Sequence, residues 1–401
     1  MRTQLANPGG VLSPEEVIGR DALAVHLWKV LTRRSLYITA ERRMGKTSIV
    51  RDKMGKAPPT GWKLIYMDVS RAVSALQFVE ALLQASREHL DASKKAKFAF
   101  FELVNKLAGV DIKSPIGLKL PEGLGPDWKM LLETLLRDIA SADSRIVLAF
   151  DELPLMLDAI KRREERREGG IKGEALVMEL LDTLRAARQE NPGLRMIFTG
   201  SLGLHHVLTA LRDQGYQNDP VNDMALIDLE PLTTEDAAEL ARRLFAGEAV
   251  TCDDLDSVAT YLASATDGIA YYIQHIVAEV GSNDEIASVP TIDKCLKNRL
   301  VDPLDPWRLN YYDERIDTHY PIPYRPIARA ILDQLAARNS MSLEELAEGI
   351  NPETIERDAE TVRKVIGLLG LDHYITIEDK RYRFRSPFIL RIWRNRREGG
   401  E

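Results

Sequence analysis

With 401 residues, of which 45% are hydrophobic and 29% charged, the chain is expected to fold into two or three domains. No apolar run reaches the roughly 18–20 residues that span a bilayer, the N-terminus lacks a signal-peptide core, and two cysteines exclude a disulfide framework or a four-ligand zinc site. We therefore expect a cytoplasmic protein with no membrane partner, and the net charge of −7 argues against nucleic-acid binding by the whole surface.

The first half of the chain alternates short apolar or β-branched runs with longer helical patterns. Predicted strands cover residues 35–39, 63–69, 145–150, 194–199 and about 225–229. Helices are expected to begin near Lys46, Ala75, Trp128 and Glu174. This alternation predicts a parallel sheet with crossover helices, which is an α/β fold.

Two segments of this half interrupt the pattern. Residues 93–127 are broken by proline and glycine, so an irregular surface excursion is expected there. The charged run at residues 161–170 predicts a solvated helix that ends at two glycines. Because it follows an acidic pair, a mobile gate is an alternative interpretation.

The predicted secondary structure changes at Pro231, from alternating strands and helices to a run of helices. Thr233, followed by Asp236, predicts a helix N-cap at the start of this run. Three helices are expected through about Leu300, and residues 301–326, rich in Pro, Asp and Tyr, are interpreted as a linker.

The last part of the chain predicts three helices and a hairpin. A helix is expected at residues 327–338, a capping box formed by Ser342 and Glu345 starts the second, and the third covers about 360–369. The alternating run YITIEDKRYRFR then predicts two strands. This order is typical of a winged helix.

The resulting domain hypothesis is a core at 1–230, a helical lid at 231–302, a linker at 303–325 and a winged helix at 326–401.

A basic segment without any acid covers residues 380–397. It predicts either a phosphate-binding face or an ordinary solvated surface, and the two interpretations remain open. The helix at about 360–369 would offer Thr361, Arg363 and Lys364 to DNA but is otherwise apolar.

The sequence AERRMGKT at residues 40–47 follows the first predicted strand and matches the phosphate-loop pattern G-x-x-x-x-G-K-[ST], except that Ala40 replaces the first glycine. Backbone N–H groups would wrap the β-phosphate where Gly45 avoids a side-chain collision, and the following helix would point its N-terminus at the anion. Lys46 is expected to bridge the β- and γ-phosphates of ATP, and Thr47 to ligate Mg²⁺. The predicted nucleotide-contacting residues of this segment are Ala40, Glu41, Arg42, Arg43, Met44, Gly45, Lys46, Thr47 and Ser48.

Two points in this loop depend on its backbone and surroundings. Ala40 fits if its φ stays negative. Arg42 and Arg43 could contact the γ-phosphate, a neighbouring subunit or acidic surface, and the sequence slightly favours acidic surface.

A second signal is the apolar strand RIVLAF, which ends in Asp151 and Glu152. Carboxylates fit at the C-terminal end of a parallel strand, where such sheets bind ligands. Asp151 is predicted to hold Mg²⁺ through water, and Glu152 to act as the general base; a structural ion pair is the alternative for Glu152. The next strand ends at Thr199 and Ser201, either of which could touch the γ-phosphate or the attacking water.

Together, ERRMGKTSIV, VIGRDALAVHLWKVL, FDEL, MIFTGS and LEPLTTEDAAELARRL resemble the archaeal-type ATPases of the AAA+ and STAND-related division of P-loop NTPases, over about residues 17–397. The resemblance implies an ATPase core, a small helical lid, a C-terminal winged helix and oligomerisation. It also implies that Ile18, Gly19 and Arg20 line the adenine and ribose side.

One departure from that family concerns the lid. The stretch Gly268-Ile-Ala-Tyr-Tyr272 lacks both a sensor arginine and the proline of the STAND pattern. Arg242 or Arg243 from the lid, or Arg212 in trans, are weak substitutes. The resulting hypothesis is an ATP-hydrolysing switch that acts through a protein partner or a homo-oligomer. The alternative is an ATP-regulated DNA-binding loader or regulator.

Overall fold

The computed structural model describes residues 3–92, 96–109, 120–141, 144–166, 172–201, 203–283, 285–350 and 359–398. The chain divides into two compact units. The sheet unit comprises Leu12–Thr39 and Lys46–Leu229, and the C-terminal unit comprises Met1–Val11, Ala40–Gly45 and Glu230–Glu401. The chain therefore passes between the units on both sides of a six-residue stretch within the predicted phosphate loop.

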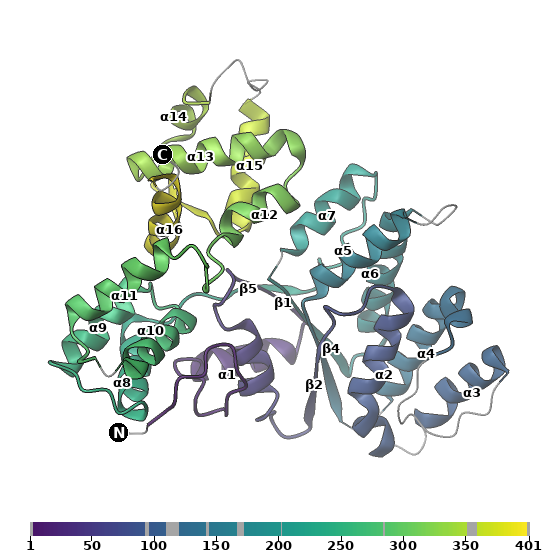
Figure 1. Ribbon diagram of the computed structural model, residues 1–401. Helices are drawn as coiled ribbons and strands as arrows, with labels where there is room; N and C mark the ends of the chain where they lie inside the picture. Colours follow the sequence, from purple (N-terminus) through teal and green to yellow (C-terminus); the bar gives the residue numbers. More distant parts are fainter. Residues whose placement is uncertain are drawn as a thin grey trace. The chain divides into compact units, whose positions relative to one another are not determined.

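The sheet unit is built on a parallel five-stranded sheet in the order β2-β3-β4-β1-β5 (Figure 1). Its strands are β1 Leu36–Thr39, β2 Trp62–Asp68, β3 Arg145–Asp151, β4 Leu194–Thr199 and β5 Ala225–Asp228. All five predicted strands are confirmed within one or two residues. Because β3 lies between two other strands and is covered on both faces, every residue after Arg145 in it is buried.

Helices of the sheet unit follow the strands in the order expected for crossover connections. They are α1 Asp21–Leu31, η1 Ser48–Met54, α2 Ala75–Ala92, α3 Ala96–Ala108, η2 Glu122–Asp127, α4 Trp128–Ala140, α5 Leu153–Glu165, α6 Gly173–Glu190 and α7 Leu204–Asp213. The apolar stripe of α4 is buried from Trp128 to Ile139, as its helical spacing predicts. α4 packs against α2, α3 and α6.

One expectation for this unit needs correction, and another is confirmed in part. The segment expected to be irregular contains α3, which buries Phe100 and Val104, one turn apart, against α4. Residues 122–127 form a 3₁₀ helix despite Pro126. The predicted solvated helix is the end of α5, and the two glycines proposed to end it, with any gate, lie outside the described residues.

The C-terminal unit is mostly helical. Its elements are α8 Thr234–Gly247, α9 Leu255–Ala265, α10 Ala270–Ser282, α11 Val289–Val301, α12 Tyr311–His319, η3 Ile322–Tyr324, α13 Arg325–Arg338, α14 Leu343–Glu348, α15 Ala359–Leu371, β6 Ile375–Glu378, β7 Arg381–Phe384 and α16 Pro387–Glu398. Four helices, α8 to α11, therefore stand where three were predicted. The N-terminal residues also join this unit, since the Gln4 N–H donates to Arg243 O at 3.1 Å and the Asn7 N–H to Gln274 Oε1 at 2.9 Å.

Local signals explain how these first helices begin. The Thr233 hydroxyl accepts from the Asp236 N–H, which confirms the predicted N-cap of α8. Between α9 and α10, Gly268 has a φ of +69°, and a Cβ there would meet Leu232 O at 2.2 Å. Glycine is therefore required at this turn both by its φ and by the close approach of a backbone carbonyl.

The proline- and tyrosine-rich segment interpreted as a linker contains a helix, α12, so that interpretation is wrong for residues 311–319. Tyr312 and Ile316 are buried on one face of α12, one turn apart. The final helix, α16, was not expected at all. It buries Phe388, Ile389, Ile392 and Trp393, a helical spacing that its many arginines obscured.

The predicted order of three helices and a hairpin is present as α13, α14, α15, β6 and β7. The reciprocal capping box of Ser342 and Glu345 starts α14 as predicted. The antiparallel hairpin turns through Asp379 and Lys380, whose φ values of +49° and +61° suit a two-residue type I′ turn. In the described part of the chain, no helix has the length and apolar character needed to cross a membrane.

Candidate functional site

Four segments of the sheet unit converge on the Asp151 carboxylate at the C-terminal edge of the sheet. Asp151 ends β3 and is buried. Its Oδ2 accepts hydrogen bonds from Thr47 Oγ1 at 2.6 Å and from the Tyr66 hydroxyl at 2.7 Å, and its Oδ1 accepts one from Thr199 Oγ1. The parallel register explains this meeting, since Asp68 pairs with Asp151, and Thr199 with Ile38.

The donor set around Asp151 suits a hard divalent cation. A hydroxyl from Thr47 and carboxylate oxygens from Asp151 are the oxygen ligands that Mg²⁺ prefers, and such a site is usually completed by phosphate and water. Thr47 and Asp151 are in direct contact, so the residues predicted to serve one metal lie together. Their role as ligands stays a prediction.

Tyr66 is a site residue that the sequence analysis missed. Burial and the neighbouring Asp151 carboxylate raise the pKa of its phenol above the ordinary value, so Tyr66 stays protonated and donates. Tyr66 stands two residues before the end of β2, on the strand next to Asp151. A hydroxyl-bearing side chain so near the carboxyl end of a parallel strand is the signal that could have found it.

Glu152 occupies the turn between β3 and α5 with a left-handed φ of 59°. Its Oε2 accepts from the Ser201 N–H at 2.8 Å and from Ser201 Oγ at 2.9 Å. Burial raises the pKa of Glu152, and the two bonds from Ser201 and the positive charge of Lys46 partly offset that rise. A partly buried carboxylate with a raised pKa has the properties of a general base.

Thr199 and Ser201, which the sequence could not distinguish, contact different acids. Thr199 donates to Asp151, whereas Ser201 holds Glu152 through its backbone and its hydroxyl. Neither acid forms a described ion pair. Among the described residues, the site is therefore held by hydroxyl and backbone donors.

The phosphate loop has the backbone that its motif requires. Gly45 has a φ of +88°, a backbone conformation that requires glycine, and its role in making room for the phosphate stays a prediction. Ala40 has no positive φ, so alanine fits at the first motif position. Lys46 is buried at the start of the helical segment, and Ser48 begins η1, which is a π-helix.

Residues preceding α1 are tied to η1, the helix that follows the phosphate loop. Gly19 has a φ of +69°, and Arg20 is the N-cap residue of α1. Lys53 of η1 donates to Pro14 O at 2.8 Å and pairs with Asp21 at 2.6 Å. This places the segment beside the loop's own helix, and its role in adenine and ribose binding stays a prediction.

The two loop arginines lie against aromatic rings of the C-terminal unit. Arg43 Nη1 donates to the Tyr272 hydroxyl at 3.1 Å, and its guanidinium lies 4.2 Å from the Tyr271 ring centroid. The Arg42 guanidinium lies 4.6 Å from the ring centroid of Tyr311. The slight preference for contacts with acidic surface is therefore wrong, because both guanidinium groups lie over tyrosines.

Glu41 begins a buried ionic triad in the same unit. Its Oε1 accepts from the Arg42 N–H at 2.8 Å and lies 3.6 Å from Arg315 Nη1. Arg315 also pairs with Asp372, and all three side chains are at least 97% buried. The Tyr320 hydroxyl also donates to Asp372 at 2.7 Å. Each buried charge of the triad therefore has a partner, without which its burial would be costly.

The arginines considered as lid sensors have acidic partners. Arg242 pairs with Asp256 at 2.7 Å, and Arg243 with Glu239 at 2.7 Å. Arg212 is exposed and lies 3.6 Å from Asp219. Arg242 and Arg243 thus form local ion pairs, and the role of Arg212 in trans stays a prediction.

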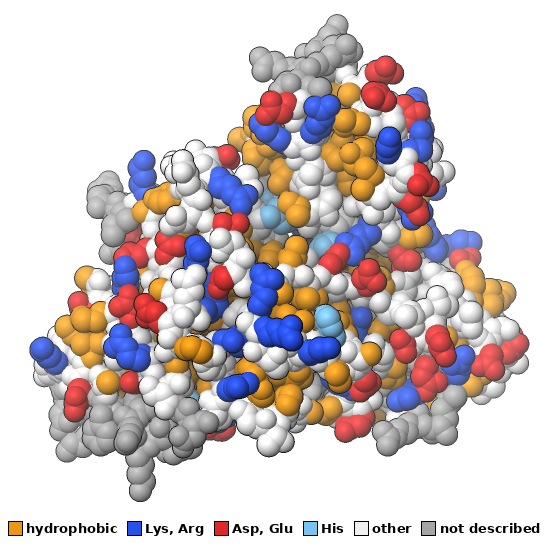
Figure 2. Space-filling view, turned by 180° about the vertical axis from the view of Figure 1, so that it is seen from behind, with side chains coloured by type: hydrophobic (Ala, Val, Ile, Leu, Met, Phe, Trp, Pro, Cys, Tyr) orange, Lys and Arg blue, Asp and Glu red, His pale blue; other side chains and the backbone are white. Residues whose placement is uncertain are grey.

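Most arginines of the basic segment are engaged inside the C-terminal unit. Arg383 pairs with Glu378 at 2.6 Å across the hairpin, Arg397 pairs with Asp333 at 2.9 Å, and Arg385 contacts His373 at 2.6 Å. Lysines and arginines as well as acids occur across the face seen in Figure 2. The described contacts therefore favour the solvated-surface interpretation of this segment over a phosphate-binding face.

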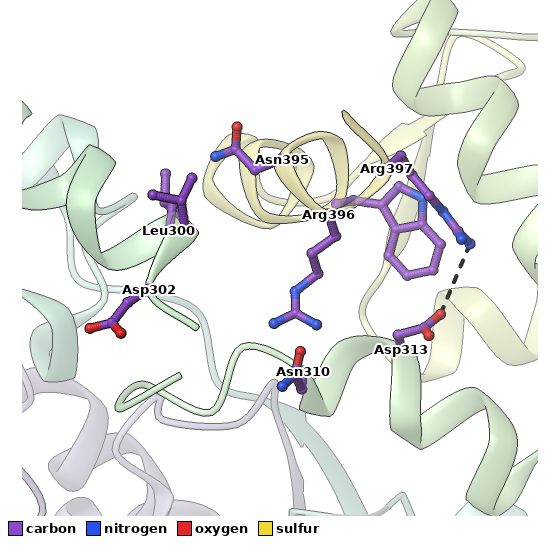
Figure 3. Close-up of a pocket in the computed structure, with 9 residues that line it drawn as sticks. Leu300, Asp302, Asn310, Asp313, Asn395, Arg396 and Arg397 are labelled. Carbon is purple, nitrogen blue, oxygen red and sulfur yellow. Dashed lines mark ion pairs between the residues drawn. The ribbon is translucent and has the colours of Figure 1, made fainter. Parts of the chain in front are cut away.

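A separate cavity of about 370 Å³ lies in the C-terminal unit, between α16 and the segment joining α11 to α12 (Figure 3). Arg396 points from α16 toward Asn310, and its Nε is buried without a partner in the described structure. Of the charged residues that line it, Asp313 pairs with Arg397 at 4.0 Å, and Asp302 pairs at 2.8 Å with Arg299, which lies outside the lining. We assign no ligand to it.

Comparisons with known proteins bear on the fold. No family model matches the chain, and no curated protein does either. The structure is similar to that of the Walker-type ATPase PABY2304 of Pyrococcus abyssi, with a TM-score of 0.62 and 18% identity over 98% of this chain and 100% of that one. It is also similar to the ORC2 protein of Aeropyrum pernix, solved as ADPNP–ADP complexes, with a TM-score of 0.54 and 12% identity over 97% and 96% of the two chains. The chain therefore has the α/β fold of the P-loop NTPases, followed by a helical C-terminal region.

Proposed function

We propose that this protein binds ATP with Mg²⁺, hydrolyses it, and uses the change from bound ATP to bound ADP to act on a protein partner. The observation that carries the proposal is the convergence of Thr47, Asp151 and Thr199 at the end of β3, beside a partly buried Glu152. The loop that leads into Thr47 matches a phosphate-binding motif at all positions but Ala40. The similarity in fold to a Walker-type ATPase and to a protein solved with ADPNP and ADP supports the same function.

Each residue of the site has a distinct role in this proposal. The loop backbone up to Gly45 and the start of the helix at Lys46 would bind the phosphates, and the Lys46 ammonium would neutralise their charge. Thr47 and Asp151 would hold Mg²⁺, which when bound neutralises charge on the phosphate oxygens. Glu152, held by Ser201, would accept a proton from the attacking water.

Two substitutions separate binding from hydrolysis. Lys46→Ala removes the loop cation, so we expect ATP affinity to fall by on the order of tenfold or more. Glu152→Gln removes the base but keeps the shape and hydrogen-bonding oxygen of the side chain. We expect it to bind ATP normally and to hydrolyse it at least about 100-fold more slowly, measured as phosphate release under single-turnover conditions.

Unchanged turnover in Glu152→Gln would refute the base assignment, and normal ATP binding by Lys46→Ala would refute the phosphate site. Glu165→Gln is a suitable control, because Glu165 is exposed at the far end of α5 and forms only a pair with Lys161 at 3.7 Å.

Action through a partner is supported by the way the phosphate loop is shared. Its residues Ala40–Gly45 group with the C-terminal unit, whereas Lys46 and Thr47 group with the sheet. The phosphate loop is therefore continuous along the chain with both units. We expect a partner, or a second copy of the chain, to be retained by Glu152→Gln with ATP and released by Lys46→Ala, measured by ATP-dependent co-purification and by mass in solution.

A further inference from the structure

The side chain of Tyr272, on α10, joins the phosphate loop to two other parts of the C-terminal unit. Its hydroxyl accepts the 3.1 Å hydrogen bond from Arg43. Its ring lies 5.1 Å from the ring of Trp307, which precedes α12, and 4.6 Å from that of Phe388 in α16. All three rings are at least 98% buried. Because packed aromatic rings cannot move independently, a change at the Tyr272 hydroxyl must alter the surroundings of Trp307.

Arg43 is held unusually for a loop arginine. It stands three residues before Lys46 and has a φ of +70°, a backbone conformation that L side chains rarely adopt. The contacts that accompany this conformation are the Tyr272 hydroxyl and the two rings of Tyr271 and Tyr272, at 4.2 and 5.5 Å. The loop conformation at Arg43 is thus maintained by side-chain contacts with α10.

Helix α10 itself, with the sequence AYYIQHIVAEVGS, contains no arginine or lysine. The cation that lies on its tyrosines comes from the phosphate loop. Burial together with the nearby positive charges of Arg43 and Arg299 lowers the pKa of His275, which stacks on Tyr271 at 4.4 Å, so His275 is neutral at physiological pH. Arg43 is consequently the cation placed between the loop and this face of α10.

We propose that Arg43 couples phosphate in the loop to the C-terminal unit through Tyr272. This inference rests on the proposed ATP site. An arginine has five donors, and it binds phosphate oxygens more strongly than a phenol oxygen or a ring face. A phosphate group in the loop therefore competes with Tyr272 for Arg43, and the loss of that contact is transmitted to Trp307 and to α16.

Trp307 supplies the reporter for a direct test. The chain has five tryptophans, so incorporation of 5-fluorotryptophan gives a small number of ¹⁹F resonances, and Trp307→Phe identifies the one from Trp307. We expect a non-hydrolysable ATP analogue with Mg²⁺ to shift the Trp307 resonance in the wild-type chain. In Arg43→Met, which keeps the length of the side chain and removes its charge, that shift should be lost.

A second variant changes the contact more gently. Tyr272→Phe removes only the hydroxyl and keeps the ring between Trp307 and Phe388. We expect at least half of the nucleotide-dependent shift of Trp307 to be lost. Tyr261→Phe is the matched control: it removes a hydroxyl that donates to Asp293 at 3.1 Å, between α9 and α11, without any contact with the loop. The control should retain the full shift.

Fluorescent ATP binding is measured in parallel, so that the two hypotheses fail separately. Arg43→Met should bind within about tenfold of wild type, because Lys46 and the loop backbone remain. If the wild-type chain binds no ATP, the proposed function fails. The wild-type chain could instead bind ATP without any response of the Trp307 resonance, or Arg43→Met and Tyr272→Phe could show the same shift as wild type. Either result would refute the coupling through Arg43 and leave the ATP site standing.

Discussion

At the scale of single residues, the acids at the end of β3 show how neighbours set different roles for adjacent side chains. Asp151 receives three side-chain hydroxyl donors, one from each neighbouring segment. Glu152, the next residue, reaches Ser201 instead and keeps a raised pKa because it is partly buried. In the proposed site, Asp151 is thus held in place by hydroxyl donors, and Glu152 has the properties of a group that accepts a proton.

The Ser201 hydroxyl should set the pH dependence of the proposed reaction. Turnover requires the Glu152 carboxylate, so the rate should fall as the pH drops through the raised pKa of Glu152. Ser201→Ala removes a donor that lowers this pKa, which therefore rises further. A hydrogen bond to a charged group contributes about 1.5 kcal/mol, so the acid limb should move up by about one pH unit.

The measurement is kcat against pH at saturating Mg·ATP. Ser257→Ala, which removes a serine hydroxyl bonded to Asp254 at 2.6 Å far along the chain in α9, should leave the limb in place. If the acid limb of the pH profile did not move in Ser201→Ala, the titration of Glu152 would not control the fall in rate at low pH.

The positions of some site residues could be predicted from the sequence, and those of others could not. Lys46, Thr47 and Asp151 follow strands whose carboxyl ends meet at one edge, so a local motif and the parallel topology suffice. Tyr66 needs the register of β2 on β3, since its partner is 85 positions away. The pairing of Glu41 with Arg315 could not be predicted, because no local pattern joins a phosphate loop to a helix near the other end of the chain.

At the scale of elements, helices with a continuous apolar stripe were predictable and those with interrupted stripes were not. α4 was evident from its spacing, whereas α3 adjoins a stretch of Pro and Gly, and α12 lies among prolines. α16 carries four arginines near its end, and its buried residues were hidden among them. Tertiary contacts, and not local preference, stabilise these three helices.

The packing of α3 on α4 has a measurable pH dependence. Asp138 in α4 accepts a hydrogen bond from the Phe100 N–H at 3.0 Å, and burial raises its pKa to about 6 from an ordinary value of 3.8. The folded chain therefore binds this proton more tightly than the unfolded chain. The stability that Asp138 provides is present at low pH and is lost as the pH rises through about 6.

Asp138→Asn keeps an oxygen acceptor for Phe100 without the charge. We expect it to exceed wild type in free energy of unfolding at pH 8 by on the order of 1 kcal/mol, after allowance for solvent screening, with the difference vanishing near pH 4. Urea unfolding at both pH values measures this. Glu133→Gln, an exposed acid on the same helix, is the control, and an equal effect from it would contradict the assignment.

At the scale of the whole molecule, charge gives little support to DNA binding. The arginines of the basic segment largely serve ion pairs and hydrogen bonds within the C-terminal unit, and α15 offers Arg363 together with a Lys364 already paired with Glu360 at 2.9 Å. The order of helices and hairpin resembles a winged helix, a module that also binds proteins. The protein-partner hypothesis therefore fits the described contacts better.

Duplex DNA retention across 50–200 mM salt tests this balance. Because most described arginines of the basic segment already have partners within the C-terminal unit, few phosphates should be neutralised there, and log affinity should fall with log salt at a slope of about 2 or less. Replacing Arg383, Arg385 and Arg391 with Ala should barely change it, as should the control replacement of Arg162, Arg163 and Arg212. A steep slope that flattens only in the first triple variant would favour the DNA-binding alternative.

The two crossings of the chain at Ala40–Gly45 have a consequence for dissecting this protein. The C-terminal unit is assembled from three separate stretches of chain, so no single cut yields it intact. A fragment that starts at Glu230 lacks Glu41, one of the two acids on the buried Arg315, and lacks the strap of N-terminal residues on α8 and α10. We therefore expect the C-terminal unit to be less stable as an isolated fragment than in the whole chain, because the fragment loses one of the two acids that contact the buried Arg315 and the N-terminal contacts with α8 and α10.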